Sequence, residues 1–438
     1  MAGPHETRAT IDAIWRLESP RVIAGLARIV REVGLAEELA QDALVAALEQ
    51  WPASGIPDNP GAWLMTTARH HALNTLAHGK MAERKHRDLG RQMDALAGDA
   101  DRIQTELAAN MDDDVNDDLL RLVFIACHPV LSTEARIALT LRLLGGLTTE
   151  EIARAFLTSE PAIAQRIVRA KRTLADKQVP FELPRREELE VRLTSVLEVV
   201  YLIFNEGYAS AVGDDWMRPA LVEDALRLGR ILSGLAPNEP EVLGLLALME
   251  LNASRAAART DAAGDPILLL DQDRARWDQL LIRRGLAALA RAKALTAAGV
   301  GGDSGAGPYQ LQAAIAACHA RARDPADTDW AGIAALYAAL EGRAPSPVVS
   351  LNRAMAVAMA DGPAAGLALV DALASEPALA AYPLLPSARA DLLSKLGRLA
   401  EARGEFERAA ALTGNKRLRV RLLARAAACG DVPPPERR

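Results

Sequence analysis

The chain has 438 residues, of which 50% are hydrophobic and 25% charged, and its formal net charge is −6. This length exceeds that of one ordinary helical domain, so we expect two to four domains in a soluble globular protein. The acidic total excludes a protein that is basic throughout, but not nucleic-acid binding, which needs only a local basic face.

Three well-separated cysteines, Cys127, Cys318 and Cys429, form no CxxC pair, which indicates a reduced, cytoplasmic protein. The N-terminus has no apolar signal core, and the longest strongly apolar run, "VVYLIF", is too short to cross a bilayer. His70 and His71 are adjacent and therefore point apart, so they are not a metal pair. We predict no metal site and no cofactor.

Aromatic residues make up only 4% of the chain, and strand-like alternation is nearly absent, so the predicted fold class is all-α. Four zones follow one another in the chain. They are a helical block at 8–82, an acidic linker at 83–118, a second helical block at 119–178 and a helical extension at 185–438.

The first block contains the amphipathic stretch "GLAEELAQDALVAALEQW". Its predicted core stripe consists of Ala40, Leu44, Leu48 and Trp51. The opposite side carries acids and an exposed leucine: Glu38, Leu39, Asp42 and Glu49. Such a face either docks a basic partner helix or is simply solvated.

The next helix is predicted in "GIPDNPGAWLMTTARHHALNTL", with Asn59 as its cap and Pro60 in its first turn. The expected buried stripe is Met65, Ala68, Ala72 and Leu76, and the exposed face carries Trp63, Thr67, His70 and Asn74, with Arg69 on its flank. An exposed aromatic ring among hydrogen-bonding groups suits unstacked bases. The alternative is a tryptophan that packs into a neighbouring helix.

The linker closes in an acidic run. Asp101 to Asp118 holds seven acidic residues against one basic residue, Arg102, which is typical of a flexible segment.

A helix-turn-helix is predicted in "LTTEEIARAFLTSEPAIAQRIVRAKRTL". Ser159 and Pro161 begin its second helix, and Ile163, Ile167, Ala170 and Leu174 form the buried stripe. The segment from Arg121 to Lys177 has nine basic and five acidic residues, so the second helix suits the major groove of DNA. The alternative is a plain helix pair with a solvated arginine-rich face.

The end of the extension shows a weak repeat of small and apolar residues. They are Ala390, Leu393, Ala402, Phe406 and Ala409 in one copy, and Ala354, Val357, Gly366, Val370 and Leu373 in the other. This spacing is typical of tetratricopeptide (TPR) repeats, in which small residues let antiparallel helices approach closely. An ordinary alanine-rich helix pair is the alternative for either copy alone.

Taken in order, these stretches resemble a bacterial sigma factor of the sigma-70 family, extracytoplasmic-function type. "AEELAQDALVAALEQW" resembles region 2.2, "GIPDNPGAWLMTTARHHALNTL" regions 2.3 and 2.4, and the helix-turn-helix region 4.2. "VVYLIFNEGYAS", "LLLDQDRARWD" and "SPVVSLNRAMAVA" are similar to stretches of members with a long C-terminal TPR-like extension.

The resemblance implies a factor that binds the β′ clamp helices and β flap of core RNA polymerase and directs initiation at −35 and −10 promoter elements. The −35 contacts it implies are Thr149, Ser159, Glu160, Ala162, Gln165, Arg166, Arg169, Lys171 and Arg172. The −10 and melting contacts are Asp58, Asn59, Trp63, Thr67, Arg69, His70 and Asn74. The core polymerase contacts are Glu38, Leu39, Gln41, Asp42 and Glu49. The linker would thread the RNA channel of polymerase, and a protein partner of the extension is left open.

The sequence leaves two alternative functions open. A helix-turn-helix regulator with a TPR-type sensor leaves the first block without a role. An enzyme in the extension would use polar residues of "FNEGY" and "DQDRARWD", namely Asn205, Glu206, Asp271, Asp273 and Arg274. The chain lacks a phosphate loop, a nucleophile elbow and metal-ligand spacing, so repeat junctions explain these residues better and we predict no enzyme.

Overall fold

The computed structural model describes residues 4–87, 114–156, 158–208, 217–261, 267–300, 305–414 and 416–430. These residues form helices and short 3-10 turns with no strand, which confirms the all-α prediction. The chain divides into two units, Met1–Leu202 and Ile203–Arg438, and each is described by itself.

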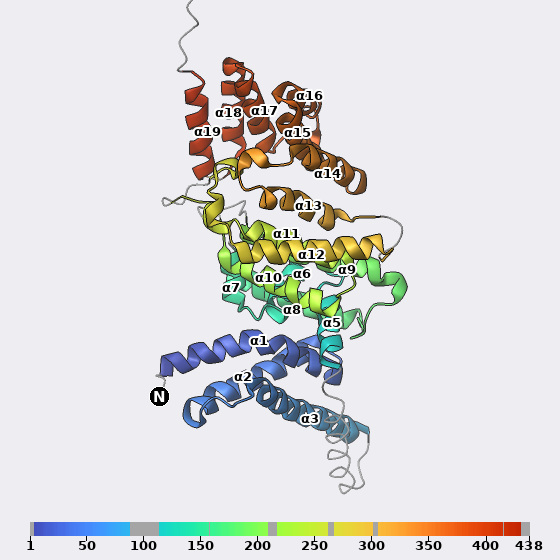
Figure 1. Cartoon of the computed structure of the whole chain (residues 1–438). Helices are drawn as coiled ribbons and strands as arrows, with labels where there is room; N and C mark the ends of the chain where they lie inside the picture. Colours follow the sequence, from blue (N-terminus) through green and yellow to red (C-terminus); the bar gives the residue numbers. More distant parts are fainter. Residues whose placement is uncertain are drawn as a thin grey trace, which may run out of the picture. The chain divides into compact units, whose positions relative to one another are not determined.

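Unit 1 begins with three mutually packed helices, α1 (Pro4–Val30), α2 (Val33–Ser54) and α3 (Pro60–Arg87), drawn in blue in Figure 1. Arg31 turns the chain between α1 and α2 with φ +56°, and the Glu32 carboxylate then accepts a hydrogen bond from the Gly34 amide. Gly55, with φ +84°, ends α2, as expected where the backbone leaves the right-handed region.

The second half of unit 1 contains α5 (Asp114–Ala126), α6 (Thr133–Leu143), α7 (Thr149–Ala155) and α8 (Glu160–Asp176), followed by α9 (Arg186–Tyr208), which crosses the boundary between the units. The first part of α9 covers α5 and α6. The Ser195 hydroxyl donates to the Cys127 carbonyl at 2.7 Å, and Arg192 donates to the Phe124 carbonyl at 2.9 Å.

The acidic linker ends earlier than its composition predicts. Residues 88–113, which carry most of the predicted linker, lie outside the described residues, but α5 already begins at Asp114. Acids are stable in the first turn of a helix because its N-terminus is partially positive. Asp118 is buried and ion-paired with Arg28 of α1 and Arg121 of α5, so the last residues of the predicted linker are structured.

Unit 2 continues with α10 (Pro219–Leu235), α11 (Pro240–Ala253), α12 (Gln279–Ala297) and α13 (Pro308–Arg321). The almost wholly buried α11 packs against the other three. Its Glu250 is paired with Arg230 of α10 at 3.0 Å and with Arg284 of α12 at 3.3 Å. Its Glu241 accepts hydrogen bonds from the first amides of α13, those of Tyr309 and Gln310.

The rest of unit 2 is a row of helices at the orange to red end of Figure 1: α14 (Trp330–Arg343), α15 (Pro347–Asp361), α16 (Pro363–Ala372), α17 (Leu384–Lys395), α18 (Leu399–Leu412) and α19 (Lys416–Ala428). Neighbouring members pack against each other along the row. The two predicted helix pairs are therefore present, as α15 with α16 and α17 with α18.

Small residues allow the close approach within these pairs. Ala354, Gly366, Ala390, Ala402 and Ala409 are all buried. A Cβ placed on Gly366 would lie 2.3 Å from the Ala358 Cβ, which is closer than atoms can pack. Of the predicted repeat positions, only Val357 and Leu373 are half-buried rather than buried.

Candidate nucleic-acid interface

The helix-turn-helix is formed by α7 and α8. Thr148 and Glu151 close a capping box around the first turn of α7, which begins that helix at Thr149. Ser159 stands at the N-cap of α8 and Pro161 lies in its first turn, although the Ser159 side chain makes no capping hydrogen bond. The predicted stripe of Ile163, Ile167, Ala170 and Leu174 is buried, so the opposite face of α8 turns outward.

The predicted −35 residues fall into two groups on this motif. Ser159, Glu160, Gln165, Arg169 and Arg172 are exposed, whereas Thr149, Ala162, Arg166 and Lys171 are half-buried. The Thr149 hydroxyl donates to Glu160 at 3.0 Å, which ties α7 to the start of α8. Lys171 faces α2, where it pairs with Glu37.

A surface hollow of about 430 Å³ lies between α8 and the start of α6. Arg166, Arg169 and Gln165 line one side, and Ser132 and Ala135 of the first turn of α6 line the other. The Ser132 hydroxyl at the start of α6 already accepts a hydrogen bond from the Ala135 amide, so the guanidinium groups of Arg166 and Arg169 are the groups here that can bind a phosphate. This hollow is therefore chemically suited to a backbone phosphate.

Helix α3 begins as predicted. Pro60 is its first residue, and the Asn59 side chain accepts a hydrogen bond from the Ala62 amide at 3.1 Å. The predicted buried stripe is partly wrong, because Leu64 is buried with Ala68 and Ala72 whereas Met65 and Leu76 are only half-buried.

The predicted −10 face is only partly open. Asp58, Asn59, His70 and Asn74 are exposed, and Thr67 is half-buried. Trp63 is also half-buried, and its ring meets the buried Trp51 ring edge to face, so the packing alternative is realised in part. Arg69 is half-buried, and burial together with nearby Arg28 lowers the pKa of its guanidinium.

Helix α2 places three of the predicted polymerase contacts on its surface. Glu38, Asp42 and Glu49 are exposed and Gln41 is half-buried. The expected exposure of Leu39 is wrong. Leu39 is only 4% exposed because the buried stripe of α2 consists of Ala36, Leu39, Ala40, Ala43, Ala47 and Trp51. Leu44 and Leu48, predicted in the core, are half-buried.

A set of ion pairs that sequence reasoning missed joins the two halves of unit 1. The carboxylate of Glu37 is 4% exposed and binds Arg142 of α6 at 2.6 Å and Lys171 of α8. Arg28 of α1 binds Asp118 at 3.2 Å, and Arg16 of α1 binds Glu151. The one feature of the sequence that could have indicated these ion pairs is the acidic Glu37, which lies next to an otherwise apolar stripe of α2.

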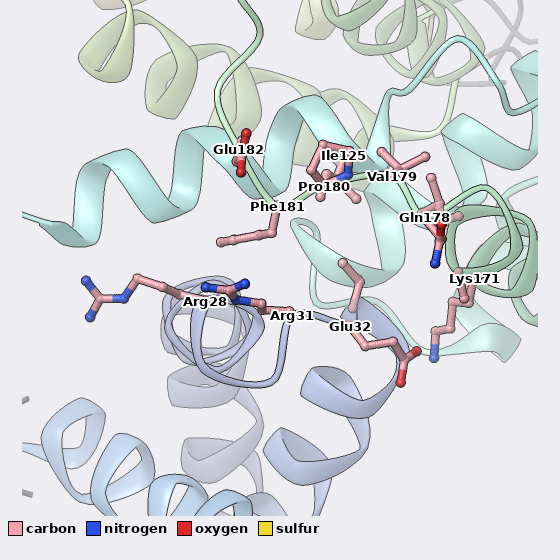
Figure 2. Close-up of a pocket in the computed structure, with 13 residues that line it drawn as sticks. Arg28, Arg31, Glu32, Ile125, Lys171, Gln178, Val179, Pro180, Phe181 and Glu182 are labelled. Carbon is pink, nitrogen blue, oxygen red and sulfur yellow. The ribbon is translucent and has the colours of Figure 1, made fainter. Parts of the chain in front are cut away.

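Figure 2 shows the cavity beside this contact, with a volume of about 450 Å³. The turn between α1 and α2 forms one wall, with Arg28, Arg31 and Glu32. The segment after α8 forms the other wall, where the Phe181 side chain points toward the space between α1 and α5.

Three of the five polar residues in the extension that an enzyme would use have local structural partners. Glu206 pairs with Arg218, and Asp273 caps the turn at Ala275. Arg274 donates to the His319 and Ala322 carbonyls at the end of α13. Within the described residues, no group of three or more His, Cys, Asp or Glu side chains is arranged to hold a metal ion. No described helix is long and apolar enough to cross a bilayer.

Comparison with known proteins decides what the two halves of unit 1 are. Residues 14–80 match the family model described as Sigma-70 region 2, and residues 121–174 match Sigma-70, region 4. The chain therefore carries Sigma-70 regions 2 and 4, and these two matches support a sigma-70 family factor. The region 2 match covers most of α1, all of α2 and most of α3, and the region 4 match ends within α8. These regions imply core RNA polymerase and promoter DNA as partners, and sigma-70 proteins are transcription initiation factors rather than enzymes.

The extension of this sigma factor matches a different model. Residues 192–293 match a family of unknown function, DUF6596. The chain is similar to an uncharacterized protein of Rhizobium meliloti (strain 1021), with 43% identity over 397 residues covering 90% of each chain. No solved structure matches it significantly.

Proposed function

We propose that this sigma factor is of the extracytoplasmic-function type and directs promoter-specific initiation by binding core polymerase, reading −35 and −10 elements and assisting DNA melting. The observation that carries the proposal is the exposure of Gln165 and Arg169 on one face of α8, in a region 4 match that follows a region 2 match on the same chain. The proposal also makes the protein cytoplasmic, because core polymerase works there.

At −35, the first turns of α8 would lie in the major groove. Gln165 is exposed there and can pair with adenine, and Arg169 can reach guanine or phosphate. A phosphate in the hollow at the start of α6 would fix the register of the helix, since backbone contacts position a protein on DNA whereas base contacts specify sequence.

At −10, the exposed groups at the start of α3 would meet the melted strand. Asp58 and Asn59 lie in the loop before the helix, and His70 and Asn74 lie further along it. The half-buried Trp63 offers part of its ring for stacking, while Trp51 holds it in place. Few cations accompany these groups, so this block contributes few phosphate contacts.

Core polymerase would bind the acidic surface of α2 formed by Glu38, Gln41, Asp42 and Glu49. The extension would regulate the factor through its TPR-like helix pairs, where α15 to α18 pack through small residues as TPR repeats do.

A helix-turn-helix regulator with a TPR-type sensor is less well supported, because it leaves residues 14–80, the Sigma-70 region 2 match, without a role. In vitro transcription with purified core polymerase separates the two. A sigma factor co-elutes with core and directs run-off from a candidate promoter, whereas a regulator binds DNA but does neither.

A further inference from the structure

Three arginines of the extension gather around two aromatic rings of unit 2. Arg255 and Arg259 flank a short 3-10 turn that follows α11, and Arg274 begins a second 3-10 turn. The guanidinium of Arg259 lies 3.6 Å from the centre of the Tyr208 ring. Those of Arg255 and Arg274 lie 5.9 Å and 4.8 Å from the centre of the Trp277 ring, and Arg255 is also 5.9 Å from that of Tyr208. Segments far apart in the sequence therefore bring positive charge to one place.

Two of these cations are held by neutral groups. Arg274 donates to two backbone carbonyls at the end of α13 and, at 3.3 Å, to the Thr328 hydroxyl. Arg255 donates to the side-chain carbonyl of Asn252. Asp324 is close enough to act on Arg274 electrostatically, but its carboxylate caps a 3-10 turn. Within the residues that the structure describes, no carboxylate forms an ion pair with Arg255 or Arg274.

This placement is electrostatically unfavourable without an anion. Burial lowers the pKa of the Arg274 guanidinium; Asp324 opposes that change and Arg255 adds to it. Cations that are taken partly out of water need compensating negative charge or hydrogen bonds, and two cations side by side need more of both. An anion that contacts Arg255 and Arg274 together would supply them.

Buried hydrogen-bonding groups lie beside the same cations. Trp277 is 4% exposed and His319 is 8% exposed. Among the described side chains, the Nε1 of Trp277, the Nδ1 of His319 and the Nε of Arg274 are buried without a hydrogen-bond partner. Burial, together with Arg255 and Arg274, lowers the pKa of His319 to about 4, so its ring is neutral at pH 7. Buried N–H groups are nearly always hydrogen-bonded, so these groups indicate a place where a ligand can add acceptors.

A small ligand can reach this place from solvent. Arg255 and Arg274 are half-buried rather than buried, as is Tyr208. A guanidinium offers its N–H groups as a fixed fork that fits the oxygens of a carboxylate or a phosphate. Two cations without acidic partners favour the phosphate, because a phosphate monoester carries nearly two negative charges at pH 7 and a carboxylate only one.

We propose that Arg255, Arg274 and the indole N–H of Trp277 bind the phosphate group of a small soluble molecule, either free phosphate or a phosphate monoester. The site lies wholly within unit 2 and does not depend on the function proposed above. Its ligand would connect the turn after α11 to the segment before α12 and to the end of α13. Binding would therefore stabilise unit 2 by mass action.

Titration of the full chain with inorganic phosphate, at an ionic strength held constant with chloride, tests the site. In a chain with isotope-labelled tryptophan, Trp277→Phe identifies the indole N–H signal of Trp277. Added phosphate is expected to shift that signal in the wild type, because the N–H gains an acceptor. It is also expected to raise the thermal unfolding midpoint of unit 2.

Three variants separate the site from general effects of charge. Arg255→Gln is expected to weaken phosphate binding, measured by calorimetry, at least about tenfold, because it removes a charge-assisted contact. Trp277→Phe keeps an aromatic ring beside both guanidiniums and removes only the N–H, so affinity should fall roughly two- to tenfold. Arg276→Gln removes an exposed arginine of the same 3-10 turn as Arg274 and should bind phosphate like the wild type.

The outcomes that contradict the site are distinct. No shift of the Trp277 signal, or equal affinity in the wild type and a folded Arg255→Gln variant, overturns it. Loss of phosphate binding in Arg169→Ala but not in Arg255→Gln would assign the phosphate to the hollow beside α8 and also overturns it. Acetate that binds as tightly as phosphate overturns the choice of a doubly charged group. Glycerol 3-phosphate separates the two sources, since tighter binding than that of phosphate supports a monoester and weaker binding supports free phosphate.

Discussion

The rings of Trp51 and Trp63 meet edge to face, with their centroids 5.2 Å apart and their planes at 67°. Trp51 lies near the end of α2 and is 2% exposed, whereas Trp63 lies in the first turn of α3 and is half-buried. The pair joins α2, the helix proposed to bind polymerase, to α3, the helix proposed to assist melting. Trp63 therefore has a structural role that any test of its role in melting must separate.

Trp63→Ala is expected to impair strand opening more than closed-complex binding, because the ring would stack on an unpaired base only after melting. It should also cost about 0.5–1.5 kcal/mol through the lost aromatic pair, beyond the buried area. Trp63→Phe keeps an aromatic ring against Trp51 and serves as the control. Permanganate footprinting measures strand opening. If the folded Trp63→Ala variant gives the same footprint as the wild type, Trp63 has no role in melting.

Arg169→Ala is expected to weaken binding to −35 duplexes of different sequence to a similar extent. Loss of one phosphate contact should also lower the slope of log affinity against log salt by about 0.9. Arg403→Ala, which removes a cation from α18 in unit 2, is the matched control for net charge. DNA titrations at several salt concentrations measure this slope. If the slope is the same in Arg169→Ala and the wild type, Arg169 does not contact a phosphate.

Two glycines in helices should respond oppositely to alanine. Gly366→Ala is expected to destabilise unit 2 by about 1–3 kcal/mol, because its Cβ would overlap Ala358 and the Ala354 carbonyl. Gly404→Ala in α18 meets no atom within 4 Å and should stabilise by about 0.5–1 kcal/mol, since alanine favours helices. Denaturant unfolding of both variants measures the difference, and equal shifts would argue against close packing of α15 and α16.

The stability of region 4 in a truncated chain is expected to depend on whether the chain keeps the first part of α9. A chain ending at residue 184 lacks the Ser195 and Arg192 contacts to region 4, whereas a chain ending at residue 202 keeps them. Burial raises the pKa of the Cys127 thiol to about 11, so Cys127 should resist alkylation in the full chain and in the longer truncation. The shorter truncation should expose it to alkylation, and equal protection in both would mean that α9 is dispensable for region 4.

The truncations also bear on regulation by the extension. If the chain ending at residue 202 transcribes like the full chain, the regulatory role proposed for the extension is excluded.

Sequence periodicity determined most of the local structure. The stripe Ile163, Ile167, Ala170 and Leu174 was readable because helix geometry alone decides which side chains share a face. The cap at Asn59, the start of α8 and the helix pairs of the extension were readable for the same local reasons. The order of the regions along the chain then gave the family.

Only the tertiary structure decided which helix faces are exposed to solvent. Leu39 and Leu44 point about 140° apart on α2, and the helices packed against α2 leave Leu39 buried and Leu44 half-buried. Glu37 and Lys171 lie 134 positions apart, and no local pattern brings them together. Burial of a charge depends on what surrounds it in space, so the sequence showed two ordinary surface charges where the fold has an ion pair between two domains.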